Sequence, residues 1–187
     1  MSHNVLLTGK ATTDRTVVRE IYVDVSNALT IIDQDHTKVH QGKYFSTGYY
    51  QELIAGGELT VLFKVDGNLC HTRFKVICGG EGEFSFFTSP TISANGTPLQ
   101  IVNNNLASSN TTTVQAYHTP TVTSTGTQKW FEYYPAGKSN SPGTVGEAGG
   151  AEAILAKDTD YLIKIRNSGQ QTHRYQLILA FYETKSV

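Results

Sequence analysis

Apolar and polar residues alternate with a period of two in one short segment after another from residue 29 onward. In the segment 59–65 the apolar side chains on one face are Leu59, Val61, Phe63 and Val65. The same alternation recurs in the segments 74–78, 84–86, 161–166 and 174–181. Because side chains of an extended chain point alternately to opposite faces, this pattern predicts half-buried β-strands.

Glycine-containing turns separate these segments. Residues 79–82 (GGEG) are predicted to join their neighbours as a hairpin loop, and Asn95-Gly96 is the strongest hairpin signal in the chain. Roughly nine or ten short strands with turns between them predict an all-β fold. We expect an antiparallel β-sandwich, jelly-roll-like, with an extended N-terminal arm.

No segment of any length has the period of a helix. The best helical candidate, 147–156 (EAGGAEAILA), is short and contains two Gly, and a helix at 36–40 is not expected. Threonine occupies every odd position from Thr119 to Thr127, so a strand there would have one threonine face. Two interpretations remain open, a solvated strand face and a polar contact surface.

Residues 1–28 differ from the rest and predict an extended arm, followed by a sandwich domain over 29–187. The apolar residues of the arm have no clear hairpin partner: Val17, Val18, Ile21, Tyr22 and Val23. We therefore expect the arm to become ordered against the body or against another subunit.

The densest aromatic cluster is KWFEYYPAG, residues 129–137. In a strand, Trp130 and Tyr134 share one face, and Phe131 and Tyr133 share the other. One face is expected to pack in the core, while the other is free for a subunit interface or for stacking on sugar rings. The candidate partner-binding residues are those of the arm together with Trp130, Tyr133 and Tyr134.

Composition narrows the possible partners. The 187 residues carry a formal net charge of −1 without a long run of either sign, which disfavours nucleic acid. No stretch is long and apolar enough to predict a transmembrane helix or a signal peptide, so we expect no membrane partner and synthesis in a cytoplasm. Cys70 and Cys78 would lie about 26 Å apart on one strand, which predicts two buried thiols.

The sequence contains fragments of catalytic and ligand-binding motifs, but each fragment lacks residues that the motif requires. Residues 135–139 (PAGKS) lack the Gly that a phosphate-binding loop requires, because that position is Glu132. His36 and His40 lack the Glu of a zinc-protease helix and would lie about 13 Å apart in a strand. The pairs Asp33/Asp35 and Asp158/Asp160 have no supporting nucleophile or metal set, and we interpret them as solvated strand ends or as a weak cation site in a turn. We expect no catalytic, cofactor or metal site, and no enzyme.

Several segments together resemble small virion proteins of tailed bacteriophages. The first, 35–45 (DHTKVHQGKYF), is similar to an H-x-x-x-H-x-G-x-x-F pattern that recurs in them. The others are 70–74 (CHTRF), 87–91 (FTSPT), 95–99 (NGTPL), 103–105 (NNN), 116–122 (AYHTPTV), 151–152, 161–165 and 177–182. The resemblance covers about residues 31–183. It departs at 105–108 (NLAS), where the similar sequences often carry N-R-x-S.

The resemblance implies a capsid decoration or cement protein, a β-sandwich subunit that binds the head surface and often forms trimers. The implied partner is the major capsid protein, and the implied location is the capsid surface of the virion after synthesis in the host cytoplasm. An alternative is a receptor- or glycan-binding module of a phage tail or fibre that uses Trp130, Tyr133 or Tyr134 as a stacking platform.

Overall fold

The computed structural model describes residues 22–23, 29–30, 34–135 and 145–184. The chain divides into two compact units, 1–37 and 38–187. In the first unit, β1 (Tyr22–Val23) pairs antiparallel with β2 (Leu29–Thr30). The prediction that Tyr22 and Val23 have no hairpin partner is therefore wrong, while Val17, Val18 and Ile21 lie outside the described residues.

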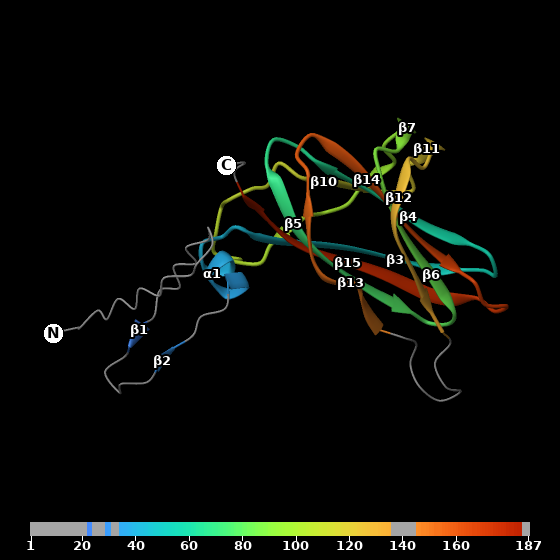
Figure 1. Cartoon of the computed structure of the whole chain (residues 1–187), viewed down its shortest axis with the longest axis horizontal. Helices are drawn as coiled ribbons and strands as arrows, with labels where there is room; N and C mark the ends of the chain where they lie inside the picture. Colours follow the sequence, from blue (N-terminus) through green and yellow to red (C-terminus); the bar gives the residue numbers. More distant parts are fainter. Residues whose placement is uncertain (1–21, 24–28, 31–33, 136–144, 185–187) are drawn as a thin grey trace, which may run out of the picture. The chain divides into compact units, whose positions relative to one another are not determined.

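Two antiparallel sheets form the body, and Figure 1 shows them as its two layers. The six-stranded sheet has the order β12 (Thr127–Tyr134), β6 (Gly82–Thr88), β14 (Thr159–Asn167), β4 (Glu58–Val65), β10 (Gln115–His118) and β8 (Thr97–Pro98). The five-stranded sheet has the order β13 (Val145–Leu155), β5 (Leu69–Cys78), β15 (His173–Thr184), β3 (Tyr44–Leu53) and β9 (Val102–Asn103). The all-β antiparallel sandwich is confirmed.

The core lies between the two sheets and is rich in aromatic rings. Phe63 of β4 meets Phe181 of β15 with ring centroids 5.3 Å apart, and Phe74 of β5 meets Phe86 of β6 at 5.1 Å. All four rings are buried. Burying one such side chain stabilises the fold by about 1.5–3 kcal/mol, so these contacts between sheets hold the layers together.

The long strands pair with distant parts of the chain. Among the described residues, eight strands have seven or more residues, and in chain order they alternate between the sheets except that β12 follows β6 in the same sheet. The loop 79–82 therefore crosses from one sheet to the other, and the hairpin predicted there is wrong. The alternation is compatible with the jelly-roll prediction.

One prediction about helices is also wrong, and the segment with the best helical pattern is a strand. The best helical candidate, 147–156, lies mostly in strand β13, which pairs with β5. The segment 36–40, where no helix was expected, lies in α1 (Gln34–His40). A seven-residue helix carries too little periodic pattern for the sequence to reveal it.

The end of α1 explains why the helix stops where it does. The Gly42 amide donates to Val39 O, and the Lys43 amide donates to Lys38 O, each at 2.9 Å, which is a Schellman motif. Gly42 has φ +64°, and a Cβ there would lie 2.1 Å from Ser108 Oγ. This position therefore requires glycine.

Asparagine side chains hold the loop after β9 against the last carbonyl groups of α1 and the turn behind it. Asn105 Nδ2 donates to His40 O, and Asn110 Nδ2 donates to Gln41 O, each at 3.2 Å. Asn103 Nδ2 donates to the backbone carbonyl of residue 42 at 2.9 Å. These bonds satisfy carbonyl groups that a helix end leaves without intrahelical partners.

A third, two-stranded sheet extends from the six-stranded one. It consists of β7 (Thr91–Ala94) and β11 (Thr121–Ser124), labelled together in Figure 1, and we call it the ribbon. The threonine face predicted for 119–127 is interrupted, because Thr119 has φ +55° and β11 ends before Gly126. The Asn95-Gly96 hairpin is also wrong, since β7 and β8 belong to different sheets.

Candidate functional site

The aromatic cluster of residues 130–134 lies on β12, an edge strand of the six-stranded sheet. Tyr134 is buried, and Trp130 is half-buried against Phe74 and Phe86 of the core. Burial raises the pKa of the Tyr134 hydroxyl, which donates to a Glu132 carboxylate oxygen at 2.8 Å. Trp130 and Tyr134 thus serve the core in the isolated chain.

The opposite face of β12 presents aromatic rings to solvent. Phe131 is 54% exposed and Tyr133 is 52% exposed, which is unusual for large apolar side chains. The predicted division of the cluster into two faces is confirmed. The candidate residues named from the sequence omitted Phe131, although its alternation with Tyr133 carried the signal. We call Phe131 and Tyr133 the aromatic edge.

The other candidate partner-binding residues belong to the first unit. Val17, Val18 and Ile21 lie outside the described residues, and only the backbone of Tyr22 and Val23 is described. The role of these five residues in binding a partner therefore stays a prediction.

A long segment of the chain that runs up to the start of β12 carries no charged side chain. Between Glu83 and Lys129 the sequence contains no Asp, Glu, Lys or Arg. The segment forms both ribbon strands, the edge strands β8 and β9, and β10. Its exposed side chains are mainly hydroxyls and amides, so a partner would be recognised by shape and hydrogen bonds rather than by ion pairs.

A hollow of about 400 Å³ opens beside this segment. Its lining is partly apolar, with Phe45, Leu99, Ile101 and Val114, and partly Asn and Thr. This volume is in the range of small-molecule sites. None of the lining residues carries a charge, so the hollow offers no acid–base pair.

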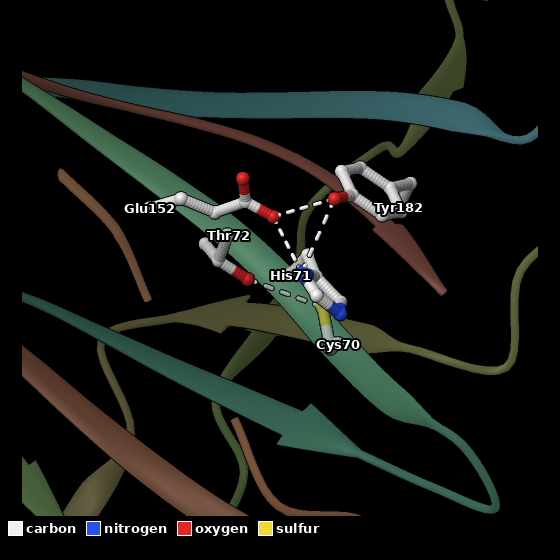
Figure 2. Close-up of polar contacts among 5 residues, drawn as sticks. All are labelled: Cys70, His71, Thr72, Glu152 and Tyr182. Carbon is white, nitrogen blue, oxygen red and sulfur yellow. Dashed lines mark hydrogen bonds and ion pairs between the residues drawn. The ribbon is translucent and has the colours of Figure 1, made fainter. Parts of the chain in front are cut away.

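A polar cluster of His71 (β5), Glu152 (β13) and Tyr182 (β15) lies on the outer face of the five-stranded sheet (Figure 2). Glu152 Oε1 is 2.5 Å from His71 Nδ1 and accepts a hydrogen bond from the Tyr182 hydroxyl at 2.6 Å. The imidazole stacks on the Tyr182 ring with centroids 4.6 Å apart. Because the register of β13 is irregular between Ala148 and Ala153, the cluster fixes this strand where its pairing resumes.

The cluster resembles a hydrolase triad in one respect, because a carboxylate holds one imidazole nitrogen while the other points away from it (Figure 2). The neighbouring thiol does not complete a triad. Cys70 lies in the core on the other face of β5, and its Sγ is 3.1 Å from Thr72 Oγ1. Burial raises the pKa of the Cys70 thiol to about 12, so it is not a thiolate nucleophile at neutral pH.

The remaining expectations about chemistry concern metals, thiols and carboxylates. α1 places His36 and His40 one turn apart, so the distance argument from a strand is wrong, although the described residues contain no group of three or more potential metal ligands. Cys70 and Cys78 are free and buried, as predicted. Asp160 forms an ion pair with Lys64 at 2.8 Å.

No helix in the described part of the chain is long and apolar enough to cross a bilayer. Comparison with protein-family models and with curated proteins gave no significant match to this chain.

Proposed function

We propose that the chain is a structural protein of a bacteriophage virion, a capsid decoration or cement protein that binds the head surface and bridges neighbouring major capsid proteins. The observation that carries the proposal is the charge-free segment between Glu83 and Lys129, whose exposed side chains are uncharged, together with the exposed aromatic edge of Phe131 and Tyr133. Such a surface favours contact over reaction. The resemblance to phage virion proteins supports the capsid surface as the place where this contact is made.

A shell under internal pressure is stabilised by a subunit that contacts two neighbours at once. The N-terminal arm, residues 1–28, is suited to reach one neighbour while the sandwich contacts another. Two linked contacts raise the effective local concentration of each, so their joint affinity exceeds that of either alone. Assembly as a homotrimer around a symmetry axis multiplies the contacts further.

A co-pelleting experiment tests the proposal. Purified chain is titrated onto phage heads assembled without it, and light scattering gives its mass in solution. We expect saturable binding by a trimer, and loss of binding without loss of the folded body when residues 1–28 are deleted. Unimpaired binding by the truncated chain contradicts the bridging role of the arm, and absence of binding by the full chain contradicts the proposal.

The aromatic edge needs its own variants. Phe131→Ala with Tyr133→Ala is expected to weaken head binding at least about tenfold, because exposed aromatic side chains are frequent hot spots of interfaces. Tyr50→Ala is the matched control, since Tyr50 is 61% exposed on β3 of the other sheet. Equal effects of the two changes contradict a role of the aromatic edge in binding.

A second candidate function is glycan binding by a tail or fibre module. One observation favours it: Phe131 and Tyr133 present two exposed rings on the same side of one strand, which is a suitable platform for stacking sugar rings. A glycan array distinguishes the candidates. Binding that disappears in the Phe131→Ala/Tyr133→Ala variant, together with no binding to heads, favours the tail module. Trp130→Ala is a poor test, because Trp130 packs against the core.

A further inference from the structure

Two segments of the charge-free region have similar sequences thirty positions apart. Residues 89–97 read SPTISANGT and residues 119–127 read TPTVTSTGT. Proline, the following threonine, the glycine and the last threonine are identical in the two segments, and Ile92 corresponds to Val122. Each segment contains one strand of the ribbon, and the two strands pair antiparallel.

The backbones of the two segments repeat the same unusual features. Ser89 and Thr119, each before a proline, have φ of +56° and +55°, which is uncommon for residues other than glycine. A Cβ at Gly96 would lie 2.2 Å from His118 O, and a Cβ at Gly126 would lie 2.3 Å from Thr88 O. Each glycine therefore packs closely against the backbone at the start of the other segment, next to its residue with positive φ.

The hydrogen bonds of the ribbon are reciprocal as well. Ser93 Oγ donates to Thr121 O at 3.3 Å, and Thr123 Oγ1 donates to Thr91 O at 3.0 Å. Position 93 corresponds to position 123, and position 91 corresponds to position 121, so the two hydrogen bonds are equivalent when the segments are exchanged. The register agrees, because Val122 pairs with Ile92 at the centre of the ribbon.

The same exchange extends into the six-stranded sheet. The Ser89 amide donates to Asp160 O of β14 at 2.9 Å, and the Thr119 amide donates to Thr60 O of β4 at 3.1 Å. Leu162 of β14 pairs with Leu62 of β4, at the centre of this arrangement. A local quasi-two-fold axis therefore passes through the β4–β14 pair and the ribbon.

The topology shows where the ribbon lies on the sheet. Its segments connect β6 and β12 on one side of the β14–β4 pair with β10 and β8 on the other side. The ribbon must therefore cross over this pair. Leu62 and Leu162 alternate with core residues along their strands, so their side chains face away from the core. Both are nevertheless 0% exposed. A ribbon that covers this face of the sheet explains their burial. Its outer side chains, including Thr91 and Thr121, are exposed.

We propose that the ribbon docks over a two-fold axis of the shell, where its two halves make the same contact with two symmetry-related partner subunits. The inference rests on the proposed function and names the place of binding. A quasi-two-fold surface offers two equivalent half-sites, and a partner surface with a true two-fold axis is the one that uses both.

The chemistry of the ribbon indicates what the partner surface presents. The described ribbon strands contain Thr, Ser, Ile, Val and Ala and no charged residue. The partner surface is therefore uncharged, with backbone and amide groups that exchange hydrogen bonds with hydroxyls. A charge placed on either half-site would become buried without a partner.

Matched half-site variants test the inference. Thr91→Lys and Thr121→Lys occupy corresponding exposed positions, and Thr172→Lys adds the same charge at an exposed position in the turn before β15. We expect each ribbon variant to weaken binding to heads assembled without the chain about tenfold, and the double variant about a hundredfold. The Thr172→Lys variant is expected to bind heads with the affinity of the unmodified chain. Because one ribbon occupies each two-fold axis, both are expected to saturate at one chain per two shell subunits.

The outcomes separate this inference from the proposed function. If the unmodified chain does not bind heads, the proposed function fails and the inference fails with it. Saturable head binding with unequal effects of Thr91→Lys and Thr121→Lys, or with no effect of either, overturns the inference alone. Dissociation of the chain's own oligomer by either variant also overturns it, because the ribbon then contacts a second copy of this chain.

Discussion

At the residue scale, Asn167 has more hydrogen-bonding partners than its sequence context suggests. This buried side chain lies at the end of β14, and its Nδ2 is within hydrogen-bonding distance of Leu53 O at 2.8 Å and Gln171 O at 2.7 Å. Its Oδ1 accepts bonds from the Gly169 amide at 3.0 Å and from the Tyr175 hydroxyl at 2.8 Å. One amide thus joins both sheets at this end of the sandwich.

We expect Asn167→Ala to lower the free energy of unfolding by about 3 kcal/mol, because several buried polar groups lose their partner at once. Asn95→Ala, at an exposed position, is the control and is expected to change stability by less than about 0.5 kcal/mol. Urea denaturation measures both. If Asn167→Ala lowers the free energy of unfolding no more than Asn95→Ala does, water must replace the hydrogen bonds of the Asn167 amide without a loss of stability.

At the element scale, the ribbon depends on two glycines whose surroundings can be tested directly. Gly96→Ala and Gly126→Ala place a methyl group against a backbone oxygen, and each is expected to lower the free energy of unfolding by at least about 3 kcal/mol. Gly67→Ala is the matched control. Its φ is +78°, as at Gly126, but a Cβ there meets nothing within 4 Å, so backbone strain alone should cost about 1–2 kcal/mol. Equal losses at the three positions contradict the close contacts.

The elements also show how far sequence reasoning reaches. Alternation identified β4, β5, β6, β14 and β15 and their buried faces, because the period of two is set by the backbone of an extended chain. The pairing of strands could not be predicted in this way, because alternation does not show which strand lies beside which. The sequence therefore led to a wrong pairing of the two strands that flank residues 79–82. Local rules also failed at Thr119, whose φ of +55° depends on the Thr60 carbonyl of another strand.

The same limits apply to the candidate site. The aromatic pattern identified two faces of β12, but only burial showed that Trp130 faces the core while Phe131 faces solvent. The His71–Glu152–Tyr182 cluster joins three strands distant in sequence, so no spacing along the chain predicts it. The similarity of residues 89–97 and 119–127 is present in the sequence, but only the antiparallel pairing of β7 with β11 shows that a quasi-two-fold axis relates the two segments.

At the scale of the whole molecule, charge is distributed unevenly although its sum is nearly zero. The 31 charged side chains, 15 basic and 16 acidic, all lie outside the segment from Phe84 to Gln128. The described ion pairs, such as Lys64–Asp160 and Lys164–Glu58, join strands of the body. The ribbon and the short strands β8, β9 and β10 therefore carry no Asp, Glu, Lys or Arg.

This distribution predicts how binding to heads responds to salt. Interactions between exposed charges are screened as ionic strength rises, whereas hydrogen bonds and apolar contacts of a neutral surface are affected little. We expect the dissociation constant to change by less than about threefold between about 50 mM and about 500 mM salt. Thr91→Lys at the same salt concentrations is the control for a charged interface. A steep loss of affinity by the unmodified chain would show that most of the binding energy comes from the charged strands of the body or from the charged residues of the arm, rather than from the neutral surface.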